Sequence, residues 1–333
     1  MIIRYPDYYQ KFRCIAAACP DSCCQEWEVD VDPEAAKAYL ALEGKLGDDL
    51  RAVLKPGDEG WMSMAITADR RCPMWQRDGL CRIQAELGHE ALCATCREFP
   101  RLQHDYGDFR ELGLELSCPE AARLILGSPD PAWAEQEEPI AEAPDYAPRH
   151  MALLLESRAQ VRTMLRELPV EQALAAILLY AYAVQEALDW DEEVDFSPAL
   201  ALAEAASLAQ PGDLGEILNL YRELEILTPR WRALLDRAPG RDPWTEEHRA
   251  LARYLVDRYW LQAISDRDLV CRAKFVVTGC LTLNALGDDL VETAQLWSKE
   301  IENDADNVDA LLDAAYTSPA LADVKLLGLL LGK

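Results

Sequence analysis

The sequence has too few basic residues for a typical nucleic-acid-binding protein. It contains 33 Lys and Arg against 59 Asp and Glu, which gives a formal net charge of −26. Because such a surface repels phosphates, we expect neither a nucleic acid nor an anionic membrane as a partner, whereas a basic partner would be attracted. Acidity is also common because it keeps proteins soluble, so the charge alone identifies no partner.

The chain also lacks the segments that direct a protein into or across a membrane. Residues 1–7, MIIRYPD, contain no apolar run followed by small residues, so no secretory signal is predicted. No window of about eighteen uncharged apolar residues occurs either. We therefore expect a soluble protein in the cytoplasm, where thiols stay reduced.

Cysteines and helix-forming sequence are abundant, and they lie in different parts of the 333 residues. Cysteines, turns and short apolar segments fill residues 1–127, a stretch rich in proline and acid covers 128–145, and helical sequence runs from 146 to 333. We predict a mainly α protein with an irregular, cysteine-rich metal-binding N-terminal domain, which has short helices and at most a small β-hairpin. A linker at 128–145 and an all-α helical bundle follow.

Local signals predict several elements. Asp32 followed by Pro33 predicts a helix start, with Asp32 as N-cap and Pro33 in the first turn. Residues 61–66 and 109–116 are predicted to be extended and can pair with each other. Beyond the linker, helices are predicted at 151–168, 170–188, 214–227, 230–237, 245–264, 266–286, 288–303 and 307–316.

Nine of the eleven cysteines lie in the first 120 residues: Cys14, Cys19, Cys23, Cys24, Cys72, Cys81, Cys93, Cys96 and Cys118. In a reducing compartment this density indicates metal or redox chemistry more than disulfides, and an odd total fits complete pairing poorly. The other two, Cys271 and Cys280, lie in apolar helical sequence and are expected to be buried packing residues.

Several cysteines have the close spacing that lowers the entropic cost of bringing thiolates to one metal. The residues at 93 and 96 form a C-x-x-C, and those at 19 and 23 are four apart. Between Cys72 and Cys81, a turn at 78–80 can fold the two sulfurs toward each other.

Four sulfurs suffice for one zinc ion or one [4Fe–4S] cluster, and nine leave room for a second site or for structural thiols. Structural zinc usually uses two C-x-x-C knuckles, whereas this sequence has one, so a cluster is favoured and zinc is the alternative metal. Side chains at adjacent positions point apart in an extended chain, so Cys23 and Cys24 are not expected to bind the same metal. If four ligands are chosen, they are Cys23, Cys72, Cys81 and Cys96, with Cys19 and Cys118 next.

Four segments around these cysteines carry a recognisable pattern. They are residues 18–27 (ACPDSCCQEW), 79–83 (GLCRI), 92–101 (LCATCREFPR) and 116–123 (LSCPEAAR). They resemble the flagellin lysine-N-methylase family, whose cysteine-rich half is similar to a broader group of zinc- or iron-chelating domains. Residues 253–259 and 266–269 also resemble the family's C-terminal half.

The resemblance implies a cytoplasmic enzyme that transfers a methyl group from S-adenosylmethionine to lysine ε-amines on the surface of flagellin, with a [4Fe–4S] cluster needed for activity. We expect it to act as a monomer. The residues alone do not indicate methyl transfer, because the sequence has neither a Gly-rich strand-to-helix fingerprint nor the C-x-x-x-C-x-x-C of common radical enzymes. The alternative is a non-enzymatic zinc- or iron-binding scaffold, or a redox sensor, with a helical interaction module.

Methylation of lysine requires a neutral amine, so a proton acceptor is expected near the cluster. The candidates are Glu115 and Glu120, which flank Cys118, and Tyr254, Asp257 and Tyr259 in a segment rich in Arg and Tyr. A carboxylate on an amphipathic helix such as Asp257 usually faces solvent, Glu120 fits the first turn of a helix, and the two tyrosines fit a helical core equally well.

Two arginines beside the C-x-x-C are candidates for cofactor binding. Arg97 and Arg101 can neutralise an anionic thiolate cluster or bind the carboxylate of a ligand.

Overall fold

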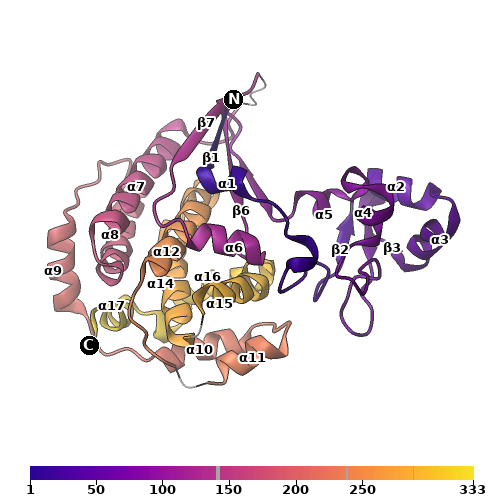
Figure 1. Cartoon of the computed structure of the whole chain (residues 1–333). Helices are drawn as coiled ribbons and strands as arrows, with labels where there is room; N and C mark the ends of the chain where they lie inside the picture. The colour runs from indigo at the N-terminus through magenta and orange to yellow at the C-terminus, as the bar shows by residue number, and fades with distance from the viewer. Residues whose placement is uncertain (140–142, 238, 288) are drawn as a thin grey trace. The chain divides into compact units, whose positions relative to one another are not determined.

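The computed structural model describes residues 1–139, 143–237, 239–287 and 289–333 and divides into two compact units (Figure 1). The cysteine unit comprises Phe12–Leu102 and Cys118–Ala121. The helical unit comprises Met1–Lys11, Gln103–Ser117 and Ala122–Lys333. The units therefore differ from the divisions at 127 and 145 that composition suggests, because the chain begins in the helical unit and returns to it after the cysteine-rich segment.

The cysteine unit combines a three-stranded antiparallel sheet with short helices. The sheet has the order β2-β4-β3. The elements are β2 (Val29–Val31), α2 (Pro33–Ala41), α3 (Gly44–Val53), β3 (Leu54–Pro56), β4 (Met62–Met64), α4 (Arg82–Leu87) and α5 (Ala94–Glu98). The predicted N-cap is confirmed, since Asp32 Oδ1 accepts a hydrogen bond from Ala35 N at 2.9 Å and Pro33 occupies the first turn of α2.

The helical unit contains a four-stranded sheet of order β5-β6-β1-β7. Its strands are β1 (Ile2–Pro6), β5 (Arg101–Asp105), β6 (Phe109–Leu114) and β7 (Trp133–Glu137). Strand β1 pairs in parallel with β6 and antiparallel with β7. The prediction of at most a small β-hairpin is therefore wrong, because the pairing joins strands about a hundred residues apart, and local sequence carries no signal for such pairs.

Two further expectations need correction. Segment 62–64 pairs with β2 and β3, and segment 109–114 pairs with β1, so they do not form a hairpin with each other. Residues 133–137, expected in a linker, form β7, whose backbone is held by β1 despite its polar side chains. Residues 140–142 of the expected linker lie outside the described residues.

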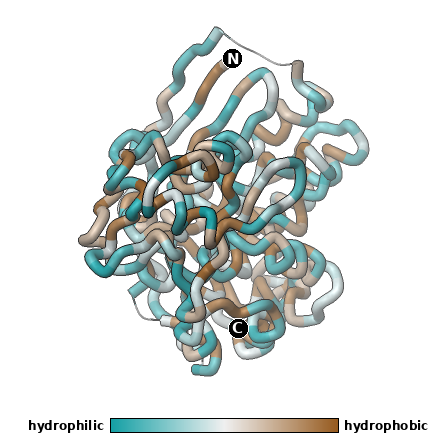
Figure 2. Tube along the Cα trace, turned by 90° about the vertical axis from the view of Figure 1, so that its right-hand side faces the viewer, coloured by the Kyte–Doolittle hydropathy of each residue, from teal (hydrophilic) through white to brown (hydrophobic). Residues whose placement is uncertain are grey.

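The described elements between 146 and 333 are all helical, as predicted. They include α7 (Pro148–Glu167), α8 (Val170–Trp190), α9 (Pro198–Leu208), α10 (Leu214–Glu223), α11 (Pro229–Leu235), α12 (Glu246–Tyr259), α13 (Ala263–Asp266), α14 (Leu269–Leu286), α15 (Leu290–Trp297), a π-helix (Ser298–Glu302), α16 (Ala305–Thr317) and α17 (Asp323–Leu331). Residue 288, the expected start of one helix, is not among the described residues. Hydrophobic and hydrophilic residues are interspersed along the whole chain trace (Figure 2).

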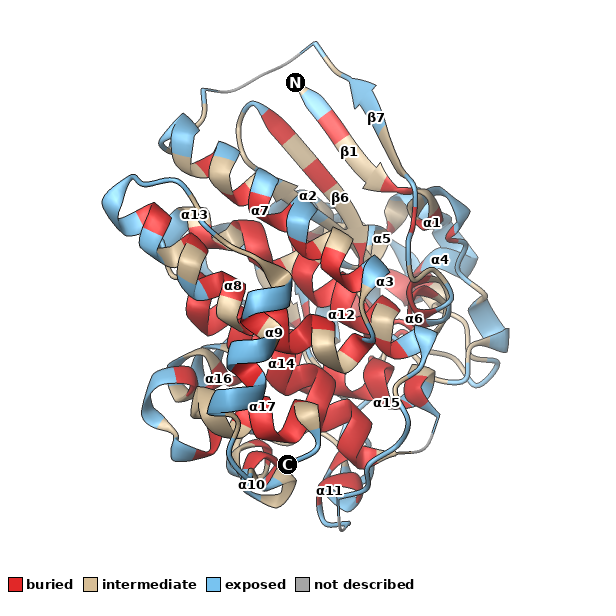
Figure 3. Cartoon of the chain, turned by 90° about the vertical axis from the view of Figure 1, so that its left-hand side faces the viewer, coloured by how far each residue is buried: buried red, intermediate tan, exposed pale blue. Residues whose placement is uncertain are grey.

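Helix α14 is the core of the helical unit and packs against α8, α12 and α16. All of its residues are buried, including Cys271 and Cys280, which confirms the packing role expected for these two cysteines (Figure 3). Among the described residues it is also the one helix that is long and apolar enough to cross a membrane. Its complete burial inside the unit is the behaviour of a core helix.

Candidate functional site

Cys24 and Cys72 face each other across a short antiparallel contact in the cysteine unit. Cys72 N donates to Cys24 O at 2.8 Å, and Glu26 N donates to Arg70 O at 2.9 Å. The Cys24 thiol hydrogen-bonds with the thiols of both Cys23 and Cys72. Backbone pairing thus brings together cysteines that lie almost fifty residues apart in sequence.

The turn between Cys72 and Cys81 folds the chain back on itself, as the sequence predicts. Gln76 N donates to Leu80 O at 2.9 Å, and Gly79 has a φ of +81°, a conformation that favours glycine. Trp75 and Cys81 form an isolated antiparallel bridge. Cys81 thereby returns to the neighbourhood of Cys72, and the two thiols interact electrostatically.

The C-x-x-C is held by the same carboxylate that caps α2. Cys93 is the N-cap residue of α5, and Ala94 N donates to Asp32 Oδ2 at 2.8 Å while Ala35 N donates to Asp32 Oδ1. Thr95 Oγ1 donates to Asp30 O at 2.8 Å. Asp32 therefore fixes the first turn of α5 relative to α2 and β2.

Neighbouring thiols in these segments shift each other's pKa values. A hydrogen bond from Cys96 lowers the pKa of Cys93 to about 7, although burial opposes the shift. A hydrogen bond from Cys24 likewise lowers the pKa of Cys72. Burial raises the pKa of Cys81. The pKa values of Cys72 and Cys93 are thus lowered, and metal ligation requires the thiolate form.

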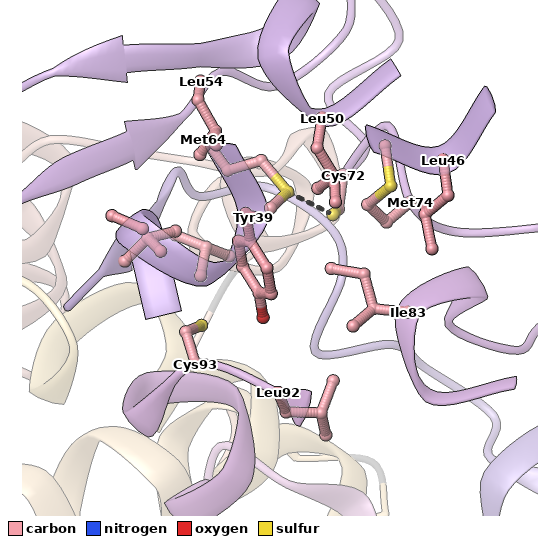
Figure 4. Close-up of a cluster of buried hydrophobic side chains, with 13 residues drawn as sticks. Tyr39, Leu46, Leu50, Leu54, Met64, Cys72, Met74, Ile83, Leu92 and Cys93 are labelled. Atoms are coloured by element: carbon pink, nitrogen blue, oxygen red, sulfur yellow. Dashed lines mark hydrogen bonds between the residues drawn. The ribbon is translucent and has the colours of Figure 1, made fainter. Parts of the chain in front are cut away.

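Six thiols from three segments suit an iron–sulfur cluster or zinc in their chemistry, because both take soft sulfur ligands. The six thiols form one electrostatic group, because Cys96 interacts with Cys72 and Cys23, Cys93 with Cys72, and Cys81 with Cys72 and Cys23. Across the described ranges, no group of three or more Cys, His, Asp or Glu side chains has the arrangement that holds a metal ion. Cys72 Sγ instead lies 3.4 Å from Met64 Sδ (Figure 4). We call Cys23, Cys24, Cys72, Cys81, Cys93 and Cys96 the thiol cluster.

Three of the nine N-terminal cysteines form a smaller group. Cys118 interacts electrostatically with Cys19 and Cys14, and Cys19 also interacts with Cys23. Cys14 is exposed and Cys118 is buried. This group borders the thiol cluster through Cys23.

The two candidate cofactor-binding arginines contact groups of the cysteine unit. Arg97 Nη1 donates to Leu92 O at 3.3 Å, and its Nε lies 3.3 Å from Glu98 Oε1. The guanidinium of Arg101 lies over the Phe12 ring, 5.3 Å from its centroid. Both side chains are thus partly engaged by the protein.

A second group of titratable side chains is buried in the helical unit around Glu302. Tyr259 donates its hydroxyl to Glu302 Oε1 at 2.9 Å, and Tyr254 donates to Glu302 Oε2 at 3.1 Å. Arg258 Nε lies 3.4 Å from Glu302 Oε1, and the Glu302 side chain is 0% exposed. Two of the predicted catalytic residues therefore bind one carboxylate that the sequence did not single out.

Glu115 belongs to the same electrostatic group. Burial raises the pKa of Glu115, nearby Arg258 lowers it, and Glu302 raises it further. Ser117 Oγ donates to Glu115 Oε2 at 3.0 Å. Glu115, Tyr254 and Tyr259, three of the five predicted candidates, are thus associated in the helical unit. Glu120 lies in the first turn of α6 (Pro119–Leu126), in the part of that helix that belongs to the cysteine unit.

Glu302 and Arg258 are the members of this group that sequence reasoning missed. Arg258 lies between Tyr254 and Tyr259 on α12, so the Arg- and Tyr-rich segment of the sequence could have indicated it as a member of this group. Glu302 ends a π-helix, a conformation that is often associated with functional sites but that no sequence pattern marked here.

Asp257 is not the solvent-facing carboxylate that the sequence suggests. Its Oδ1 accepts from Arg162 Nε at 2.7 Å and its Oδ2 from Arg253 Nε at 3.0 Å. Burial raises the pKa of Asp257, and the surrounding arginines outweigh this effect and lower it. It is therefore a structural ion-pair partner that links α7 to α12.

Comparison with known proteins identifies the family. The chain is 36% identical over 140 residues to proteins named lysine-N-methylase from Salmonella typhimurium and Salmonella choleraesuis, a match to 40% of this chain and 35% of each relative. It is also 35% identical over 130 residues to the flagellar biosynthetic protein FliU of Salmonella muenchen. This alignment covers 38% of this chain and 77% of FliU. The chain belongs to the flagellin lysine-N-methylase family.

The matches cover only part of the lysine-N-methylases, so the activity of those proteins cannot be assigned to this chain from the matches alone. The aligned part of the chain spans about a third of the length of the lysine-N-methylases, 35% in both cases. No family model and no solved structure matches the chain. Activity, substrate and cofactors therefore depend on the chemistry of the residues described above.

Replacing Asp32 tests its double capping role. Asp32→Ala removes acceptors for Ala94 N and Ala35 N, and we expect the free energy of unfolding to fall by about 2 kcal/mol. Asp32→Asn keeps one acceptor oxygen and should lose about half as much. Urea unfolding followed by circular dichroism measures both changes, and equal stability of wild type and Asp32→Ala would show that the caps contribute nothing.

The same residue gives a pH dependence. Hydrogen bonds from Ala94 N lower the pKa of Asp32 in the folded chain, so its stabilisation is present above the ordinary carboxyl pKa of about 4 and is lost as pH falls through the folded-state pKa. The difference between wild type and Asp32→Ala should therefore shrink in acid.

Removing the charge of Glu302 should destabilise the helical unit. Glu302→Gln leaves the buried Arg258 without its counter-charge, and we expect a loss of about 3 kcal/mol in urea unfolding. The matched control is Glu292→Gln, which breaks an ion pair with Arg230 whose side chains are 62% and 61% exposed and should change stability by under about 1 kcal/mol. Equal effects of the two substitutions would contradict the assignment.

Proposed function

We propose that this chain takes part in the methylation of lysine ε-amines on the surface of flagellin, with S-adenosylmethionine as the methyl donor. The observation that carries the proposal is the 36% identity to lysine-N-methylases over 140 residues. The match to a flagellar protein, FliU, supports a flagellar substrate. The proposed setting is the cytoplasm, with the chain acting as a monomer.

The thiol cluster is the proposed holder of a [4Fe–4S] cluster, with zinc as the alternative metal. Cys72 and Cys93 have lowered pKa values, so we propose them as the first two thiolate ligands, and two of Cys23, Cys81 and Cys96 complete the set of four. When bound, such a cluster supplies an iron to which S-adenosylmethionine can bind. Arg97 and Arg101 would balance the negative charge of the ligated thiolates and bind the carboxylate of the methyl donor.

Glu115 is the proposed proton acceptor. A lysine amine attacks the methyl carbon only after it loses a proton, and a carboxylate whose pKa is raised toward the working pH accepts that proton well. The new C–N bond forms as the C–S bond breaks, S-adenosylhomocysteine leaves, and the proton remains on Glu115. Tyr254 and Tyr259 act as positioning residues through Glu302, and Glu120 is the second candidate acceptor.

A methylation assay tests the proposed activity. Purified flagellin incubated anaerobically with the chain and S-adenosylmethionine should gain methyl groups on lysine, as detected by mass spectrometry. Cys93→Ser and Cys72→Ser should lose iron and most of this activity, because each removes a thiolate ligand. Cys271→Ser is the matched control, since that thiol is buried in α14 of the other unit.

Two results would refute this proposal. Unmodified flagellin after incubation with iron-loaded protein would exclude the enzyme. Stoichiometric zinc in anaerobically prepared protein, without iron, would favour the metal-binding scaffold instead.

The role of Glu115 predicts a pH profile. The rate should fall in acid as Glu115 becomes protonated, and Glu115→Gln should lower kcat on the order of a hundredfold or more. Ser117 Oγ stabilises the ionised carboxylate, so Ser117→Ala should raise the pKa of Glu115 and move the acid limb of kcat/KM to higher pH. An unchanged acid limb in Ser117→Ala, or full activity in Glu115→Gln, would show that Glu115 is not the proton acceptor and would favour another group such as Glu120.

A further inference from the structure

The most exposed large apolar side chains of the described residues flank one loop of the helical unit. Leu200 on α9 is 73% exposed, and Trp190 at the end of α8 is 72% exposed. Single exposed apolar residues are common on protein surfaces. These two, however, lie at either end of the loop 191–197, and α9 adds further exposed apolar positions.

Helix α9 carries apolar residues on both its buried face and its exposed face. Ala201 and Ala205 are buried, where α9 packs against α8 and α17. The outward positions Ala199, Leu200, Ala203, Ala206 and Leu208 are exposed (Figure 3). An exposed apolar helix face of this kind is typical of a surface that binds a partner.

The surroundings of this face are acidic. No Lys or Arg occurs between Arg166 and Arg222, whereas eleven Asp and Glu lie in that interval. Asp191, Glu192, Glu193 and Asp195 are exposed in the loop next to α9, and Glu204 is exposed on the helix itself.

Two cations from other elements reach this region. Arg149 lies 3.3 Å from Asp191 Oδ1, and the ammonium of Lys333 donates to Ala206 O. His150 also lies near Asp191, at 3.4 Å. These contacts leave the carboxylates of Glu192, Glu193, Asp195 and Glu204 to give the surface its negative potential.

We propose that Trp190, the loop 191–195 and the outward face of α9 form a docking surface for a lysine-bearing amphipathic segment of the protein substrate. The apolar side of that segment covers Leu200, Ala203 and Leu208, and its ammonium groups pair with the carboxylates of the loop. Trp190 packs against the aliphatic stem of a lysine and attracts its charge. The inference rests on the proposed function and specifies the chemistry of the substrate segment.

The negative charge of this surface favours one kind of occupant over the others. A second copy of the chain would bring two acidic loops together, and an anionic membrane would meet the same repulsion. A cationic segment gains from both the apolar contact and the charge.

The test measures binding and methylation separately. The double variant Trp190→Ala/Leu200→Ser removes the apolar contact, and the triple variant Glu192→Gln/Glu193→Gln/Asp195→Asn removes three charges. The matched control is Asp306→Asn/Asp309→Asn/Asp313→Asn, which makes the same charge change at exposed positions of α16. Binding of full-length chain to purified flagellin is measured by calorimetry at low and moderate salt.

We expect both test variants to weaken flagellin binding about tenfold and to raise KM with little change in kcat, since none of the substituted residues is among the groups proposed to react. Binding of wild type should weaken with salt, whereas the α16 control should bind like wild type.

The outcomes separate this inference from the proposed function. Unchanged binding and KM in both test variants, while wild type methylates flagellin, would overturn the docking surface alone. Binding that depends on Trp190 without methylation would support the docking surface and refute the proposed function. A wild-type dimer in sedimentation that the double variant dissociates would show that a second copy covers the face and would overturn the inference.

Discussion

The cysteine unit depends on one carboxylate that accepts hydrogen bonds from the first turns of two helices. Asp32 Oδ1 binds Ala35 N of α2, and Asp32 Oδ2 binds Ala94 N of α5. A helix start leaves backbone N–H groups without partners, so a shared acceptor both satisfies them and fixes the two helices relative to each other. The position of the C-x-x-C in the unit follows from this contact.

The same constraint places thiols where they influence each other's protonation. Two further segments reach the C-x-x-C region: the strand-like contact of Cys24 with Cys72, and the turn that returns Cys81. The neighbouring Cys96 thiol lowers the pKa of Cys93 to about 7. Ligation of a metal by these cysteines would require the thiolate form.

Local chemistry made part of this structure predictable. The Asp32 N-cap, the turn at 78–80 and most of the later helices depend on neighbours in sequence, and their patterns indicated them. The sheet of the helical unit joins β1 to partners more than a hundred residues away, and Glu302 meets Tyr254 and Tyr259 only through the packing of a π-helix on α12. Such contacts leave no local signal, so the candidate tyrosines were identified without the carboxylate that binds them.

We propose that the thiol cluster holds one iron–sulfur cluster. The most direct measurement is the metal content and visible absorption of the chain purified without oxygen. We expect a brown protein with about four irons per chain and the broad absorption of a [4Fe–4S] cluster. Colourless protein that holds neither iron nor inorganic sulfide after anaerobic reconstitution would contradict it.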